Sequence, residues 1–165
     1  MDKSVILNQE DIQRKIRRIA FQIYESNVNE KRVVLAGISQ NGFVLAKSLA
    51  EVLKEISDLD VQLCEVKIDK KNVYKPIQTS LEPKDYQNQS VVLVDDVLHT
   101  GTTMMYGVKH FLEVTMKQFR TVVLIDRNHK KFPIKADFKG LSLSTSYQNH
   151  VEVVLERNNK EVYLV

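Results

Sequence analysis

The sequence has a single cysteine, Cys64, among its 165 residues. One thiol excludes an internal disulfide and a cysteine-based zinc site, and it suits a reducing compartment. No apolar run approaches the roughly 20 residues that a membrane-spanning helix requires. The first residues lead directly into a polar helix pattern instead of the apolar core of a signal peptide. We therefore expect a cytoplasmic protein without a membrane partner.

Proline is also scarce, with three residues, and the chain contains neither an internal repeat nor a low-complexity segment. Apolar residues make up 43% and charged residues 27%, close to the average of globular proteins. This composition excludes a disordered tail, a collagen-like fibre and a disulfide scaffold. Since domains usually span about 100–200 residues, we expect a single domain over residues 1–165.

Positive charge exceeds negative charge by only three, but it is unevenly distributed. Two segments are basic: one holds Arg14, Lys15, Arg17 and Arg18, and the other holds Arg127, Lys130, Lys131, Lys135 and Lys139. Such clusters suit RNA or phosphate-rich ligands, although most clusters of this kind are only a solvated face. Both interpretations remain open on the sequence alone.

Strand and helix patterns alternate along the chain. Apolar residues spaced by three and four predict a first amphipathic helix, with Asn8 and Asp11 as its capping pair. The patterns that follow predict strands at 31–37, 61–68, 90–94 and 121–125, helices at 43–56 and 102–116, and a C-terminal β-hairpin around residues 157–160. This alternation indicates an α/β fold, in which a mostly parallel central sheet is flanked by helices.

Residues 70–89 lack periodicity and contain two of the prolines. A stretch of this length without regular structure inside a compact domain is typically functional. We interpret it as a flexible lid over a site. Ligands of parallel sheets bind beyond the carboxyl ends of the strands, which points to residues 37–42, 95–103 and 126–129.

The most informative segment follows the strand at 90–94. Asp95 and Asp96 are expected at its exposed carboxyl end, and a loop with threonines and one glycine then opens a helix. Gly101 lets the backbone approach a phosphate, and the helix N-terminus and threonine hydroxyls supply donors. Carboxylates repel phosphate but accept strong hydrogen bonds from sugar hydroxyls. The segment therefore predicts a site for a ribose 5-phosphate group.

An acidic pair at a strand end also occurs in response regulators and on solvated sheet edges. A response regulator carries its acidic pair on the first strand, whereas here the pair lies at residues 95 and 96. A merely solvated strand end does not account for the Thr-Gly-Thr-Thr sequence that follows. Both alternatives are therefore weaker than a sugar phosphate site.

The histidines and the cysteine have weaker signals than the acidic pair. His99 lies within the loop and is expected to contact the lid more than to act as a base. His129 is equally compatible with a surface role or a ligand contact. His110, His150 and Cys64 fit structural roles.

Residues 95–103 resemble the 5-phosphoribosyl-1-pyrophosphate (PRPP) motif of type I phosphoribosyltransferases. Residues 91–103 and 124–138 together resemble the branch that combines pyrimidine operon attenuation with uracil phosphoribosyltransferase activity, the PyrR type. Residues 37–49 are similar to its pyrophosphate loop and following helix. The resemblance implies the type I phosphoribosyltransferase fold.

The same resemblance implies Mg²⁺-dependent transfer of a phosphoribosyl group from PRPP to a pyrimidine base, uracil giving UMP, with release of pyrophosphate. The implied residues are Asp95 and Asp96 as catalytic carboxylates that stay ionised and hold the ribose hydroxyls, Thr100, Gly101, Thr102 and Thr103 for the 5-phosphate, Gly37, Ile38, Ser39, Gln40 and Asn41 for pyrophosphate, and Asp126 and Arg127 on the base side. Mg²⁺ is expected to be held mainly through PRPP, with Asp95 and Asp96 as candidate ligands. A homodimer or homotetramer is implied. The alternative is a nucleotide-responsive RNA-binding regulator with weak or no transfer activity.

The chain departs from this branch in its pyrophosphate loop, which usually contains a basic residue. Residues 37–42 read GISQNG, with neither lysine nor arginine. Because pyrophosphate is the leaving group, the missing cation removes stabilisation of developing negative charge. On this basis Asn41→Arg is expected to raise activity. Thr102 also stands where the branch has a basic residue, and Lys70, Lys71 and Lys75 lie at the start of the lid.

Overall fold

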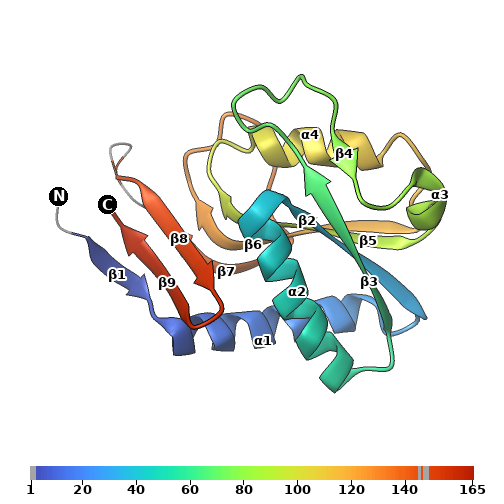
Figure 1. Ribbon diagram of the computed structural model, residues 1–165, viewed down its shortest axis with the longest axis horizontal. Helices are drawn as coiled ribbons and strands as arrows, with labels where there is room; N and C mark the ends of the chain where they lie inside the picture. Colours follow the sequence, from blue (N-terminus) through green and yellow to red (C-terminus); the bar gives the residue numbers. More distant parts are fainter. Residues whose placement is uncertain (1–2, 145, 147–148) are drawn as a thin grey trace.

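The computed structural model describes residues 3–144, 146 and 149–165. In chain order its elements are β1 (Ser4–Leu7), α1 (Gln9–Ser26), β2 (Arg32–Ile38), α2 (Ser39–Ile56), β3 (Asp60–Lys67), β4 (Gln78–Thr79), α3 (Pro83–Tyr86), β5 (Ser90–Leu98), α4 (Thr102–Phe111), β6 (Gln118–Arg127), β7 (Phe138–Leu143), β8 (Val151–Glu156) and β9 (Asn159–Leu164). Figure 1 shows their arrangement.

A six-stranded sheet forms the centre, in the order β4-β3-β2-β5-β6-β7. Its neighbouring strands are parallel except for β4, which pairs antiparallel with β3. The predicted mostly parallel sheet is therefore confirmed. Its central strands are apolar without alternation because both faces are covered.

Alternate residues of these strands enter two separate cores. On β2, Val33 and Leu35 join a core formed with α1 and α2, whereas Val34 and Ala36 face a second core that includes Met104 of α4. Helices therefore cover both faces of the sheet, as the sequence predicted. The capping pair of α1 is also confirmed, since Asn8 and Asp11 form a reciprocal capping box.

The C-terminal hairpin is confirmed as β8 and β9, but it does not extend the central sheet. It forms a second, antiparallel sheet in the order β1-β9-β8. The strand β1 was not predicted, because four residues before a strong helix pattern carry little signal of their own. Val151, Val153 and Leu155 of β8 pack into the core of α1 and α2. Figure 1 shows this small sheet at one side of the molecule, next to both termini.

Several predicted boundaries were wrong where tertiary contacts extend an element. The strand β5 continues through Asp95 and Asp96 to Leu98, because it pairs with β6 over that length. The predicted loop at 38–42 is largely absent: Ile38 ends β2, and α2 begins at Ser39 with a kink at Gln40 (φ 18°, ψ −89°). The helix α4 ends at Phe111, short of the predicted residue 116.

The lid prediction was wrong in extent. Of the range 70–89, residues 78–79 form β4 on the edge of the central sheet, and residues 83–86 form α3. Tyr86 is buried and its ring packs against Phe111, with centroids 4.9 Å apart. Residues 70–77, 80–82 and 87–89 lie outside helices and strands. Among the described residues, no helix has the length and apolar character needed to cross a membrane.

Candidate active site

A pocket of about 310 Å³ lies where β5 ends and α4 begins. Residues from four parts of the chain line it: Lys70 before β4, residues 95–101 with Thr103 and Met104, Arg127 at the end of β6, and His150 and Val151 at the start of β8. Its place at the carboxyl ends of parallel strands agrees with the location predicted from the sequence.

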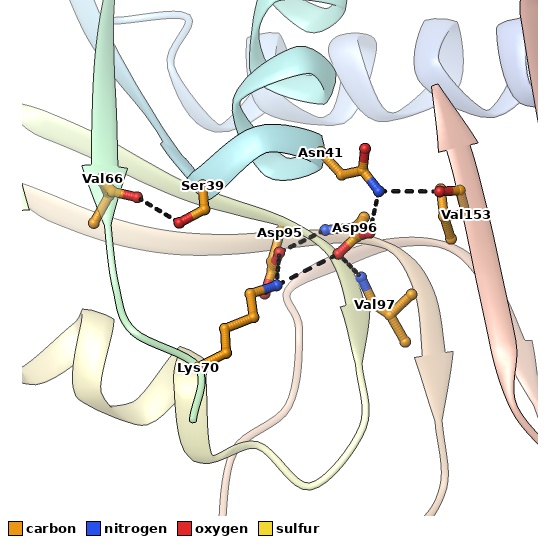
Figure 2. A network of polar contacts seen from close by, with 8 residues as sticks. All are labelled: Ser39, Asn41, Val66, Lys70, Asp95, Asp96, Val97 and Val153. Carbon is orange, nitrogen blue, oxygen red and sulfur yellow. Dashed lines mark hydrogen bonds and ion pairs between the residues drawn. The ribbon is translucent and has the colours of Figure 1, made fainter. Parts of the chain in front are cut away.

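The acidic pair lies inside this pocket, but it is not exposed. Asp95 is 2% exposed because it remains part of β5, so the expectation of an exposed strand end was wrong for this residue. Its Oδ1 accepts the backbone N–H of Asp96 at 2.9 Å. Oδ1 of Asp96 in turn accepts the backbone N–H of Val97 at 2.8 Å. Each of these local bonds holds one oxygen of a carboxylate, as Figure 2 shows.

Burial raises the pKa of Asp95 from 3.8 to about 7, and the neighbouring charge of Asp96 adds to the increase. The ammonium group of Lys70 opposes it. A carboxyl group with this pKa is only partly ionised at neutral pH in the ligand-free protein. Strongly perturbed acids in a pocket are typical of functional sites.

Lys70 supplies a cation to this acidic pair. Its Nζ lies 3.2 Å from Oδ1 of Asp95 and 3.8 Å from Oδ1 of Asp96 (Figure 2). From the sequence, Lys70 was expected at the start of the lid but was not assigned to the site. The contact between Lys70 and Asp95 joins residues far apart in sequence. The group of lysines at 70, 71 and 75 was therefore the only sequence signal for a cation at this site.

The first turn of α2 approaches the acidic pair from the opposite side to Lys70. Nδ2 of Asn41 donates to Oδ2 of Asp96 at 2.9 Å and to the backbone carbonyl of Val153 at 3.0 Å. The turn comes this close because residue 42 is glycine: a Cβ atom there would lie 2.7 Å from the carbonyl oxygen of Val94. Close packing against β5 thus requires a glycine at this position.

The residues predicted to bind pyrophosphate have different surroundings. Gly37 and Ile38 belong to β2, and neither residue lines the pocket. The Ile38 side chain is buried in the core next to α4. The Ser39 hydroxyl lies 3.5 Å from the carbonyl oxygen of Val66. Both amide hydrogens of Asn41 are used within the protein, which leaves its Oδ1 as an acceptor only.

The predicted phosphate loop lies in the pocket with one exception. Thr100, Gly101 and Thr103 line it, whereas Thr102 does not. The hydroxyl groups of Thr100 and Thr102 are 2.9 Å apart, so Thr102 supports the loop from within. Gly101 has a left-handed conformation (φ 87°) as the residue that precedes α4. Since Thr103 and Met104 also line the pocket, the N-terminus of α4 opens into it.

The predicted base-side residues separate. Arg127 lines the pocket and is 2% exposed, and its guanidinium donates to the backbone carbonyl of Asn149 at 2.7 Å. Asp126 points away, into a second cavity of about 730 Å³, where it pairs with Lys130 and, at 3.2 Å, with Lys139. Consecutive residues of a strand point to opposite faces, which accounts for the separation.

Two histidines complete the pocket. His99 lines it, and burial, followed by the charge of Arg127, lowers the pKa of its imidazole. His150, for which the sequence suggested a structural role, lines the pocket as well. No local pattern could have identified His150, because it reaches the site only through the docking of β8. Cys64, in contrast, is fully buried, as predicted.

The two basic clusters meet at one point. The Arg18 guanidinium on α1 donates to the backbone carbonyls of Lys139, at 3.1 Å, and Gly140, at 2.8 Å, on β7. Arg18 is therefore occupied in joining α1 to β7. Arg127 is buried in the pocket, and Lys130 pairs with Asp126, so several cations of the second cluster serve internal contacts.

Comparisons with known proteins identify the family to which the chain belongs. The family model described as the phosphoribosyl transferase domain matches residues 3–157. The chain belongs to the phosphoribosyl transferase family. This confirms the resemblance drawn from residues 95–103 and the α/β fold expected from it.

Similar phosphoribosyltransferases include two named bifunctional protein PyrR. The one from Streptococcus thermophilus is 35% identical over 158 residues, covering 94% of this chain and 91% of the relative. The one from Fusobacterium nucleatum is 33% identical over 170 residues, covering 98% and 96%. These matches confirm the similarity to the PyrR branch.

Solved structures of other phosphoribosyltransferases share the fold. The hypoxanthine phosphoribosyltransferase of Trypanosoma cruzi superimposes with a TM-score of 0.79, covering 98% of this chain and 95% of its own at 16% identity. A hypoxanthine-guanine phosphoribosyltransferase from Bacillus anthracis gives a TM-score of 0.73 at 19% identity, covering 89% and 87%. At these identities the likeness concerns the fold alone.

Proposed function

We propose that this protein transfers the 5-phosphoribosyl group of PRPP to a pyrimidine base, most directly uracil to give UMP, and releases pyrophosphate. The observation that carries the proposal is the position of Asp95 and Asp96 in one pocket with the N-terminus of α4. A sugar whose hydroxyls meet the carboxylates can place its phosphate at the helix N-terminus. The choice of a pyrimidine follows from the similarity to the PyrR relatives.

In this proposal the acidic pair binds the ribose hydroxyls and stabilises positive charge on the sugar. Transfer from PRPP develops oxocarbenium character as the bond from C1 to pyrophosphate breaks. Asp95 and Asp96 lie on one strand with fixed carboxylates, so little reorganisation is needed as that charge develops. The pKa of Asp95 is about 7. When the sugar binds, its hydroxyl donors and nearby positive charge would favour the ionised form of Asp95.

The 5-phosphate would bind at the turn formed by Thr100, Gly101 and Thr103. Backbone N–H groups at the start of α4 and the threonine hydroxyls are the donors, and the partial positive charge of the helix N-terminus favours an anion. The left-handed Gly101 holds the backbone in the shape that exposes these groups.

Lys70 is the cation that would neutralise the leaving pyrophosphate. The turn at 37–42 offers no basic side chain, and Lys70 Nζ already lies within 4 Å of both carboxylates. Its side chain is 47% exposed and comes from a segment without regular structure, so it can move from the acidic pair to an incoming ligand. The side chain of Asn41 lacks a free donor for this task.

The pocket also fits a Mg²⁺ ion held mainly through the substrate. This proposal is supported by the position of the Lys70 ammonium group, which lies within 4 Å of both carboxylates. Among the described residues no cluster of three potential metal ligands occurs. Mg²⁺ usually keeps several waters and takes one or two carboxylates plus phosphate oxygens, so Asp95 and Asp96 would be its protein ligands. When bound, the ion would add charge stabilisation to pyrophosphate.

The nucleobase would lie between β6 and the start of β8, where Arg127, His150 and Val151 line the pocket. A cytoplasmic location and assembly into a homodimer or homotetramer remain predictions of the resemblance. Transfer is tested by incubating the protein with PRPP, Mg²⁺ and each of several radiolabelled purines and pyrimidines. Label in UMP with matching pyrophosphate release is the expected result. Product from a purine alone would overturn the choice of base, and no product from any base would overturn transfer.

Regulation through RNA is a second candidate function. It is favoured by the word "bifunctional" in the name of the relatives and by the exposed Lys131 and Lys135 of the second basic cluster. In this candidate, a pyrimidine nucleotide in the pocket would change the affinity for RNA. Turnover and RNA binding are measured separately, and a protein can have either property without the other.

A further inference from the structure

The Asn41 side chain forms a hydrogen bond to each of the two sheets. One of its amide hydrogens goes to Asp96 on the central sheet and the other to the carbonyl of Val153 on the small sheet (Figure 2). The two bonds measure 2.9 Å and 3.0 Å, lengths typical of well-formed hydrogen bonds. One planar amide group therefore links β8 directly to the acidic pair.

The carbonyl of Val153 requires such a partner. β8 is an edge strand of its sheet, since it pairs with β9 and has no other neighbour in the described strand order. One row of backbone groups on an edge strand lacks partners within the sheet. The Val153 side chain is buried in the core formed with α1 and α2. An unpaired carbonyl in this partly buried position would lower stability.

At the other end of the bridge, Asn41 fixes the second oxygen of Asp96. Oδ1 of Asp96 accepts from the backbone N–H of Val97 and lies near Lys70, while Oδ2 accepts from Asn41. The carboxylate is therefore held on both oxygens and cannot turn freely. Without Asn41, one oxygen would lose its partner and the carboxylate could rotate.

We propose that Asn41 is a positioning residue that ties β8 to Asp96 and thereby orients the acidic pair for the sugar of PRPP. It acts through Asp96 and has no donor left for pyrophosphate. This role extends the proposed function, on which its effect on PRPP binding depends. It also reverses the expectation for position 41: Asn41→Arg should lower PRPP affinity because it breaks the bridge, even though it adds a cation.

The bridge itself is tested by hydrogen–deuterium exchange in the ligand-free protein, which does not require activity. Asn41→Leu removes both donors at similar size, and Asn41→Asp retains a polar group if the leucine variant fails to fold. Ser48→Ala is the matched control, because it removes a polar side chain from the same helix. Among the described residues, the hydrogen bond of the Ser48 hydroxyl goes to the carbonyl of Val44 within α2. We expect exchange in residues 151–156 to accelerate about tenfold in the Asn41 variants and to stay unchanged in the control. Unchanged exchange in the Asn41 variants would overturn the bridge.

The action through Asp96 is tested by a double-mutant cycle on PRPP binding measured by calorimetry. Asn41→Leu should weaken binding on the order of tenfold, as expected for loss of a hydrogen bond to a charged group. In an Asp96→Asn background the same change should weaken binding less than twofold. Equal losses in both backgrounds would overturn a role through Asp96. If the wild-type protein binds no PRPP, the proposed function fails, and the exchange experiment alone still decides whether the bridge exists.

Discussion

Lys70 Nζ lies 3.2 Å from Oδ1 of Asp95, and the two groups differ sharply in exposure. The Asp95 side chain is 3% exposed and that of Lys70 is 47% exposed. Strand pairing fixes the carboxylate, whereas the cation comes from outside regular structure. The acidic pair can therefore exchange Lys70 for the hydroxyls of a ligand without moving the sheet.

The first prediction concerns this cation. Lys70→Met should lower kcat/KM for PRPP about tenfold or more, since charge-assisted contacts of this kind contribute about 1.5–3 kcal/mol. Because Lys70 lowers the pKa of Asp95, its loss should also shift the rise in activity to higher pH. Steady-state kinetics from pH 6 to pH 9 measure both effects.

Lys71→Met is the matched control, because Lys71 is an exposed neighbour of the same type. It should leave the kinetics within about twofold of wild type. Lys70→Arg should retain most activity, since it keeps the charge. Equal effects of Lys70→Met and Lys71→Met would contradict a specific role for Lys70.

The second prediction concerns stability and pH. The pKa of Asp95 is raised from 3.8 to about 7 on folding, so the folded state binds this proton more tightly than the unfolded state. The tighter binding of this proton stabilises the folded state. This stabilisation is complete below pH 3.8 and is lost as the pH rises through about 7. Asp95→Asn removes this dependence on pH. The Tm of the variant minus that of wild type should therefore increase by several degrees between pH 4 and pH 8. A change of about 1 kcal/mol corresponds to about 2–4 °C for a chain of this size.

Differential scanning calorimetry across this pH range measures the effect. The groups that face Asp95 are Asp96 and Lys70, and both remain in the variant. Asp58→Asn, an exposed aspartate, is the control for general effects of removing a negative charge. A Tm difference between Asp95→Asn and wild type that does not change with pH would rule out the raised pKa.

The sequence predicted the parts of the site that depend on neighbouring residues. Asp95, Asp96 and the turn at Gly101 lie within a few positions of one another, so their pattern alone indicates a sugar phosphate site. The alternation of apolar strands and helices likewise predicted the central sheet, because its strands are buried on both faces. The lid was placed too broadly, since burial of Tyr86 organises the end of that segment.

The contacts that complete the site join distant segments, and no local pattern reports them. Lys70 reaches Asp95 across 25 positions, and Asn41 reaches Val153 across 112. The strand β1 was missed for the same reason, as it pairs with β9 from the other end of the chain. Asp126 and Arg127 are adjacent in sequence but enter different cavities, which follows from strand geometry once the strand is known to extend through them.

The third prediction concerns the turn that would hold the 5-phosphate. A Cβ atom at Gly101 would lie 2.6 Å from Cγ2 of Ile134, and the residue has φ 87°. Gly101→Ala should therefore lower stability by about 1–3 kcal/mol and abolish the increase in Tm that PRPP produces. Adding Ile134→Ala relieves the contact but not the backbone strain, so the PRPP effect should stay absent. Thermal unfolding with and without PRPP measures this, and a normal PRPP shift in Gly101→Ala would contradict the assignment.

The fourth prediction concerns RNA and depends on which cations are free to bind it. Arg18 is bonded to β7, Arg17 lies 3.8 Å from Glu55, and Lys130 pairs with Asp126. Lys131 and Lys135 are exposed, and the described part of the chain contains no ion pair of either within 4 Å. An RNA-binding surface formed by the two basic clusters should therefore depend on Lys131 and Lys135 more than on Arg18.

Lys131→Gln with Lys135→Gln should weaken RNA binding and reduce the slope of log K against log salt by about 0.7 for each lost phosphate contact. Lys54→Gln with Lys84→Gln removes the same charge from α2 and α3 and is the control. Filter binding at several salt concentrations measures both, and PRPP affinity should be unchanged because neither lysine lines the pocket of the acidic pair. Equal losses in the two double variants would reveal only a net-charge effect. Absence of wild-type RNA binding at low salt would remove the regulatory candidate and leave transfer alone.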